Sequence, residues 1–405
     1  MKNLYNLPQK NNKTIRLFLK YFFLITVTFS YAQINYNAPW VKAAKISEGD
    51  KINFNDVVAA GDSYWENRDK HVKGSGYKLF KRWESYWQNY VDQSGYLPSI
   101  DELYGTWQKK NDFRLSRNTN GSSQSDQSNW ISMGPKNFLN RPTNSANLGR
   151  LNCITPHPTN SDILYAGSPA GGIWKSEDAG LTYVPLSDNL PQIGVSSIAI
   201  DYTNPNIIYI ATGDDDALDS FSVGIWKSID GGLSWNPTAL NPSNSPLVIH
   251  EIEMHSNNPE IMWAATSLGV YKTVNSGDNW TNIQQGYFQS VKQKPGNPSV
   301  VYAITRSQFF ISNNEGYSFT LGRTFGEGNQ PARMEMDVTP INPEIVYVLA
   351  CDDAYQFGGI YKSSNSGSTF TKTANTADIF NSQQAWYDLA LAVSDSDENE
   401  LYVGV

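Results

Sequence analysis

The sequence contains few cysteines and little charge, and it has no long apolar run after its first 32 residues. Its two cysteines, Cys153 and Cys351, are too few for a disulfide framework, and we expect two separate buried thiols. Charged residues make up 17% of the chain and the net charge is −8, which argues against nucleic acid or an anionic membrane as the main partner. No later segment is long and apolar enough to cross a bilayer, so we expect no transmembrane anchor.

Residues 1–32 have the pattern of a secretory signal peptide. A basic region precedes a short apolar core from Tyr21 to Phe29, and Ser30-Tyr31-Ala32 ends in a small residue of the kind found at signal peptidase sites. The apolar core is too short for a membrane anchor. We therefore predict cleavage before Gln33 and a secreted or cell-surface protein.

Residues 33–117 have apolar residues at helical spacing. Helices are predicted over Asp56 to Arg68, over Tyr77 to Val91, and from Ser99 to Lys109, where Ser99 and Glu102 have the spacing of a capping box. The apolar positions include Tyr64, Trp65, Phe80, Trp83, Trp87 and Tyr90. We interpret them as the core of a small helical region, with an aromatic sugar-binding platform as the alternative. Residues 118–129, rich in Ser and Asn, are predicted to form a linker.

The abundant feature of the chain is a repeated turn, Ser-x-Asp-x-Gly-x-Ser/Thr-aromatic, best seen at Ser228, Asp230, Gly232 and Trp235. The Asp side chain can accept hydrogen bonds from the backbone of its own turn, and Gly supplies the positive φ of a hairpin. The other copies are Ser176, Asp178, Gly180 and Tyr183; Thr273, Asn275, Gly277 and Trp280; Ser312, Asn314, Gly316 and Phe319; and Ser363, Asn365, Gly367 and Phe370. Asn keeps the acceptor oxygen but loses the charge, so we interpret these five box turns as structural.

The box turns begin 52, 45, 39 and 51 residues apart, a period typical of propeller blades. Each follows two apolar strands joined by an Asn-containing turn, with an aromatic residue five positions after the Asn. These pairs are Asn160 and Tyr165, Asn204 and Tyr209, Asn258 and Trp263, Asn297 and Tyr302, and Asn342 and Tyr347. The sequence thus predicts an all-β, multi-bladed β-propeller of four-stranded antiparallel blades. The predicted propeller follows the N-terminal helical region. It consists of five repeats and a partial sixth, which is formed by Leu389 to Val393 and Leu401 to Val405.

The repeats resemble the Asp-box (BNR) repeat of sialidases, xyloglucanases and the sortilin ectodomain, over about residues 130–405. The half blade at the end leads us to expect an incomplete ring from the front part of a longer protein. Trp130-Ile-Ser-Met is expected to be an outer strand that completes the last blade. A sialidase would need an arginine triad; the chain has Arg150, Arg306, Arg323 and Arg333 but lacks the Arg-Ile-Pro signature of that family.

Candidate site residues lie on the loops between the second and third strands, on the face opposite the box turns. These loops are long and acidic in repeats two and five. Their residues are Asp214, Asp215, Asp216 and Asp219 in one loop, and Asp352, Asp353, Tyr355 and Phe357 in the other. They could form a calcium site with Asp214 and Asp216 as ligands, an acid/base pair for glycoside cleavage, or solvated loops.

Taken together, the residues and the resemblance favour a sortilin-like module that binds an extracellular protein or polysaccharide over an enzyme, and they leave the question of enzymatic activity open. It requires no cofactor, with calcium as the one candidate ion. The alternative is a glycoside hydrolase of the xyloglucanase kind, which an aromatic-lined cleft with two facing carboxylates would favour. His250 and His255 are five residues apart on a predicted strand, so they point to opposite faces and cannot share one metal ion.

Overall fold

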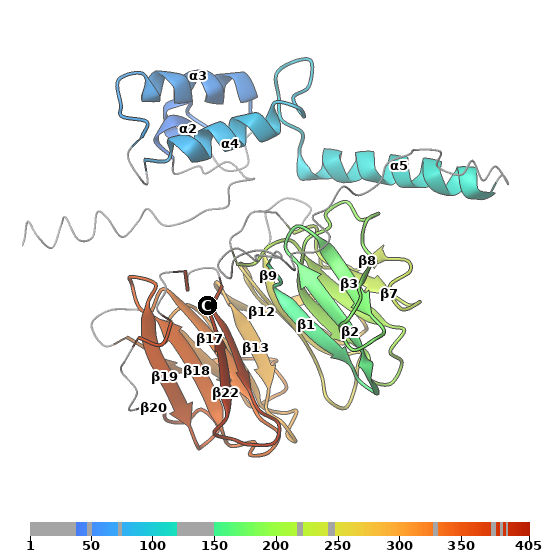
Figure 1. The fold of residues 1–405 in the computed structure, drawn as a ribbon, viewed down its shortest axis with the longest axis vertical. Coiled ribbons are helices and arrows are strands. Elements are labelled where there is room, and N and C mark those ends of the chain that lie inside the picture. The colour runs from blue at the N-terminus through green and yellow to red at the C-terminus, as the bar shows by residue number, and fades with distance from the viewer. Residues whose placement is uncertain are drawn as a thin grey trace, which may run out of the picture.

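The computed structural model describes residues 38–46, 51–71, 75–119, 150–216, 222–241, 248–326, 331–373, 378–380, 384–385 and 388–405. Figure 1 shows a set of twisted β-sheets with the helices on one side of them. The predicted signal peptide, the strand predicted at Trp130 and the candidate residue Asp219 lie outside the described residues.

The N-terminal helices are α2 (Pro39–Ala43), α3 (Phe54–Trp65), α4 (Tyr77–Trp87) and α5 (Ile100–Thr119). The predicted aromatic positions mostly face inward: Trp65, Phe80, Trp83 and Trp87 are buried, and Phe54 stacks on Trp83 with ring centroids 5.5 Å apart. These residues form a core, as the helical spacing predicted, and Tyr90 alone of the named set is largely exposed, at 46%.

Helix α5 begins at the predicted capping box. The backbone N–H of Ser99 donates to Glu102 Oε2 at 2.7 Å, and the N–H of Glu102 donates to Ser99 Oγ at 3.1 Å. The helix continues to Thr119, beyond its predicted end at Lys109. Its Trp107 donates from Nε1 to the carbonyl of Asn189 at 2.7 Å and packs edge-on against Trp226, 5.3 Å between centroids. These contacts attach α5 to the first two blades.

Five four-stranded sheets and one two-stranded sheet follow in chain order. The first three are β1 (Cys153–His157), β2 (Asn160–Ser168), β3 (Gly172–Ser176), β4 (Val184–Pro185); β5 (Val195–Ile200), β6 (Ile208–Thr212), β7 (Ile225–Ser228), β8 (Asn236–Pro237); and β9 (Ile249–Met254), β10 (Met262–Thr266), β11 (Gly269–Thr273), β12 (Thr281–Gln285). The others are β13 (Ser290–Gln293), β14 (Val301–Ile304), β15 (Gln308–Ser312), β16 (Thr320–Thr324); β17 (Arg333–Val338), β18 (Val346–Cys351), β19 (Phe357–Ser363), β20 (Thr371–Lys372); and β21 (Ala390–Val393) with β22 (Leu401–Gly404).

Each sheet is an antiparallel meander, and the sheets pack through their first strands in the order β1, β5, β9, β13, β17, β21. This is the architecture of a β-propeller, with those six strands innermost. The second strands are the most buried: every residue of β6, β10, β14 and β18 is inaccessible to solvent or nearly so. The apolar runs that predicted them are therefore strands covered on both faces by neighbouring blades. The predicted blade order and the half blade at the end are confirmed.

The aromatic residue of each second strand joins its blade to the next one. All five are at least 97% buried. Tyr209 Oη donates to the carbonyl of Ser276 at 3.3 Å, and Trp263 Nε1 donates to that of Glu315 at 3.2 Å. Both acceptors are residues of the following box turn. In the second and third blades, the aromatic position and the following box turn thus form the same contact between blades.

The box turns are closed by side-chain hydrogen bonds. In the first, Ser176 Oγ accepts from the N–H of Gly180 and donates to Asp178 Oδ1, both at 2.8 Å, and Asp178 also accepts from the N–H and hydroxyl of Thr182. Where Asn replaces Asp, one bond reverses its direction: Asn314 Nδ2 donates to Ser318 Oγ at 3.0 Å. The residue before each box glycine also has a positive φ, of 55–57° at the four positions that are not Gly. The sequence pattern did not reveal this conformation.

The aromatic residue of the second box turn and the two cysteines differ in burial. Trp235 is only partly buried and donates from Nε1 to the carbonyl of Leu186 at 3.0 Å, at the boundary between the first two blades. The cysteines are separate free thiols, but only Cys351 is fully buried, whereas Cys153 is partly buried at the start of β1.

Candidate functional site

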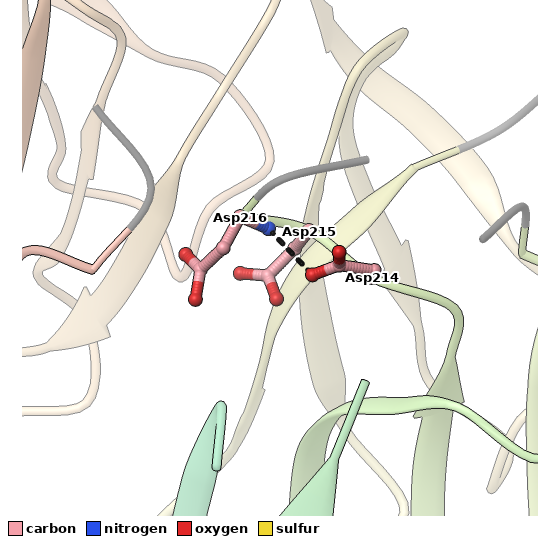
Figure 2. Close-up of side chains that lie close together, drawn as sticks. All are labelled: Asp214, Asp215 and Asp216. Atoms are coloured by element: carbon pink, nitrogen blue, oxygen red, sulfur yellow. Dashed lines mark hydrogen bonds between the residues drawn. The ribbon is translucent and has the colours of Figure 1, made fainter. Parts of the chain in front are cut away.

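The first acidic loop lies where the inner strands begin, at one end of the propeller axis. Asp214, Asp215 and Asp216 directly follow β6, and their carboxyl groups each contribute an oxygen atom to a group no wider than 4.8 Å. Figure 2 shows the three carboxyl groups on the same side of the loop, with the N–H of Asp216 donating to Asp214 Oδ1 at 3.2 Å. We call this end of the axis, with the side chains described below, the mouth.

Two arginines from other blades contact this loop. Arg150, just before β1, pairs with Asp214 Oδ2 at 2.5 Å, and the side chain of Asp214 is fully buried. Arg333, the first residue of β17, pairs with Asp216 at 2.5 Å and with Glu335 at 2.8 Å. Because Asp216 belongs to the second blade and Arg333 to the fifth, this ion pair crosses the propeller axis. The mouth is therefore assembled from residues far apart in the sequence.

Asp215 lies against an imidazole rather than an arginine. His250 Nδ1, on β9, is 3.8 Å from Asp215 Oδ2, and the imidazole packs on the Tyr287 ring with centroids 5.0 Å apart. Burial, together with the positive charges of Arg333 and Arg306, lowers the pKa of His250 to about 3. The ring is therefore neutral at physiological pH and does not offset the charge of Asp215.

The carboxyl groups of the mouth are correspondingly hard to ionise. Burial, followed by the negative charge of Asp216, raises the pKa of Asp215 well above its ordinary range. Burial also raises the pKa of Glu335 to about 7, although Arg333 opposes that change. A carboxyl with such a pKa is partly protonated at neutral pH and could donate a proton.

Several buried polar atoms at this end have no hydrogen-bond partner among the described residues. They are Asn152 Oδ1 and Nδ2, Asp215 Oδ1, His250 Nε2, Gln289 Oε1 and Asp388 Oδ1. All belong to the acidic loop or to residues at or near the starts of β1, β9, β13 and β21. Buried polar groups are normally paired, so a ligand at the mouth could complete the hydrogen bonding of these atoms.

Deeper along the axis, charged side chains bond neighbouring inner strands to each other. Glu251 accepts from Ser290 Oγ at 2.7 Å and from the N–H of Val291 at 3.0 Å, and it pairs with the ammonium of Lys292. Asp337 accepts from the N–H of Val393 at 2.8 Å. These carboxylates have partners on the next blade, so we assign them to holding blades together.

Among the described residues, no hydrogen bond or ion pair joins the second acidic loop to the first. Asp352 accepts from the N–H groups of Ala354 and Gln356, both at 2.9 Å and within its own turn, and Asp353 is exposed. Phe357 packs edge-on against Phe380, 5.3 Å between centroids, and Tyr355 has a positive φ of 61°. The structure thus brings together only the first half of the predicted site.

Sequence reasoning missed the residues from other blades. Arg150 and Arg333 were considered only for a sialidase triad, and Glu335 was not considered. His250 was considered only together with His255, as a pair that cannot share one metal ion. His255 lies elsewhere and stacks on Trp263, with ring centroids 5.8 Å apart. Only the presence of each residue at the start of an inner strand could have indicated its position.

Comparison with known proteins gives partial similarities. No family model matches the chain. A xyloglucanase, Xgh74A, from Acetivibrio thermocellus is 28% identical over 145 residues, which are 32% of this chain and 17% of that protein. A Paenibacillus xyloglucanase is 24% identical over 187 residues, 44% of this chain and 18% of that protein. The matched segments thus span less than a fifth of these relatives.

Solved structures of similar shape include an ancestral GH74 enzyme and YCF48 bound to D1 peptide. The first has a TM-score of 0.46 at 18% identity and covers 57% of this chain and 32% of that chain. The second has a TM-score of 0.44 at 16% identity, and the match covers 63% of this chain and 75% of that chain. Among the described residues, no helix is long and apolar enough to cross a membrane. The chain folds as a β-propeller, and part of its sequence is similar to xyloglucanases.

Proposed function

We propose that this propeller acts on a polysaccharide outside the cell, as a glycoside hydrolase of the xyloglucanase kind, with its site at the mouth. The strongest support comes from the carboxyl group of Glu335 and its surroundings. Its carboxyl has a pKa near 7 and lies in a group of further carboxyls. Glycoside cleavage needs one carboxyl that is protonated at working pH and a second that is ionised.

In this proposal Glu335 is the general acid that protonates the departing glycosidic oxygen. Arg333 donates to one of its oxygens, Oε1, from both Nε and Nη2 at 3.0 and 2.8 Å, which fixes the orientation of the carboxyl. The partner carboxylate would come from Asp215, Asp216 or Asp388. The xyloglucanase relatives support a β-glucan chain as the substrate.

The test is release of reducing ends from xyloglucan by the purified chain, together with binding of xyloglucan oligosaccharides. Glu335→Gln should abolish cleavage and leave oligosaccharide binding within about threefold, because the amide keeps the shape but cannot donate the proton. Asp353→Asn removes an exposed carboxylate of the second acidic loop and serves as the matched control. Equal cleavage by wild type and Glu335→Gln would contradict the assignment.

A second candidate function is binding without cleavage, by a sortilin-like module for an extracellular protein or glycan. It is favoured by the engagement of Asp214 and Asp216 with arginines, because a carboxylate held in an ion pair is less available for chemistry. Wild-type protein that binds xyloglucan but releases no reducing ends would support this second function.

A further inference from the structure

The acidic loop has the spacing of a cation site. Two oxygen ligands of one Ca²⁺ ion, each at about 2.4 Å from it, lie at most about 4.8 Å apart. One oxygen from each of Asp214, Asp215 and Asp216 satisfies that limit without any movement of the side chains. Clustered carboxylates alone are common on protein surfaces, so the surroundings must show that something binds there.

The first such observation is His250. This residue is 92% buried, its Nδ1 lies 3.8 Å from Asp215 Oδ2, and its Nε2 has no hydrogen-bond partner among the described residues. Asp215 Oδ1 is a second buried atom without a hydrogen-bond partner, and leaving two such atoms on neighbouring residues unpaired is costly unless a ligand contacts them.

The second observation is the ion pairing of the acidic loop. Arg150 pairs with Asp214 and Arg333 pairs with Asp216, whereas Asp215 has no ion pair with an arginine among the described residues. A bound cation would give Asp215 the positive partner that the other two carboxylates already have.

We propose that Asp214, Asp215 and Asp216 bind one calcium ion at the mouth of the propeller. Hard carboxylate oxygens suit calcium, and the arginine contact to Asp216 uses Oδ1, so its second oxygen remains as a possible ligand. Asp215 is the ligand most dependent on the ion, because Asp214 and Asp216 are already paired with arginines. The site shares Asp215 and Asp216 with the candidate partner carboxylates of the proposed hydrolase, but binding of the ion does not require cleavage by Glu335.

The experiment is calorimetric titration of calcium chloride into the full chain after removal of divalent ions by EDTA and exchange into chelator-free buffer. We expect one site per chain with a Kd of about 10⁻³ M or tighter. Asp215→Asn should weaken binding at least tenfold, since it removes the carboxylate without disturbing either arginine pair. Asp353→Asn makes the same chemical change on an exposed loop and should leave the Kd unchanged.

Thermal melting of the wild type provides a readout that needs no variant. Calcium at ten times the Kd should raise the melting temperature above that in EDTA, because an ion that binds only the folded chain stabilises it. Absence of binding heat in the wild type, an unshifted melting temperature, or equal affinity of the Asp215→Asn and Asp353→Asn variants would overturn the site. No glycan is present in either measurement, so failure here leaves the hydrolase proposal unaffected, and loss of cleavage by Glu335→Gln says nothing about calcium.

Discussion

The two ends of the propeller satisfy their polar groups in different ways. At the end formed by the box turns, each Ser or Thr and each Asp or Asn bonds within its own turn, as Ser228 and Asp230 do. At the mouth, carboxyls meet arginines from distant blades, and buried atoms such as Asp215 Oδ1 and His250 Nε2 have no partner among the described residues. A repeated, locally complete network stabilises the fold, whereas an incomplete and irregular one is where a ligand would complete it.

The largest effect is expected where a box turn meets the neighbouring blade. Trp263→Ala should lower the free energy of unfolding by about 3–5 kcal/mol, because it removes a fully buried indole and its hydrogen bond to Glu315. Chemical denaturation monitored by far-UV circular dichroism measures the change. The half-buried Trp235 is the matched control, and Trp235→Ala should cost roughly 2 kcal/mol or less. Equal costs would show that burial between blades is not what stabilises this end.

The pH dependence of stability should also differ between the charged groups along the axis and those of the box turns. Burial raises the pKa of Glu253, on the inner strand β9, to about 7, although Lys292 opposes the change and Glu251 and Asp337 contribute to it. A carboxyl with a raised folded-state pKa stabilises the fold at low pH, and that stability is lost as the pH rises through about 7. The hydrogen bonds of the box turn lower the pKa of Asp178 to about 2, so its contribution is instead lost only when the pH falls toward 2.

We therefore expect the melting temperature of the wild type to fall as the pH is raised from 4.5 to 7 in calcium-free buffer. Glu253→Gln carries a neutral amide at every pH and should flatten this part of the profile. Differential scanning calorimetry at matched ionic strength measures both curves. A Glu253→Gln curve parallel to that of the wild type would place the responsible group elsewhere.

The same contrast explains what could be predicted from the sequence. A box turn such as Ser312 to Gly316 depends on residues within five positions of one another, so its chemistry is visible in the sequence. The blade follows from the period, because each apolar strand and its aromatic residue recur in register. The long β6–β7 loop was chosen as a candidate site because three consecutive acidic residues are conspicuous, and its role as a site stays a prediction.

The partners of that loop could not be predicted, because they depend on how the blades curve around the axis. Arg333 reaches Asp216 from 117 positions along the chain, and nothing local to either residue specifies that contact. The second acidic loop was grouped with the first on composition alone, yet Asp352 bonds only within its own turn. Local periodicity gave the scaffold, whereas the charge network required the arrangement of blades.

The smallest effect is expected within a single box turn. Asp230 accepts from the N–H of Ser234 at 2.8 Å and from its hydroxyl at 2.5 Å. Asp230→Asn keeps the first bond and reverses the second, as Asn314 already does toward Ser318, so it should cost about 1 kcal/mol or less. Asp230→Ala loses both bonds and should cost more, about 1–2 kcal/mol, in the same denaturation experiment. If Asp230→Asn instead abolished xyloglucan or calcium binding at an unchanged melting temperature, the box turns would be ligand sites and the distinction between the two ends would fail.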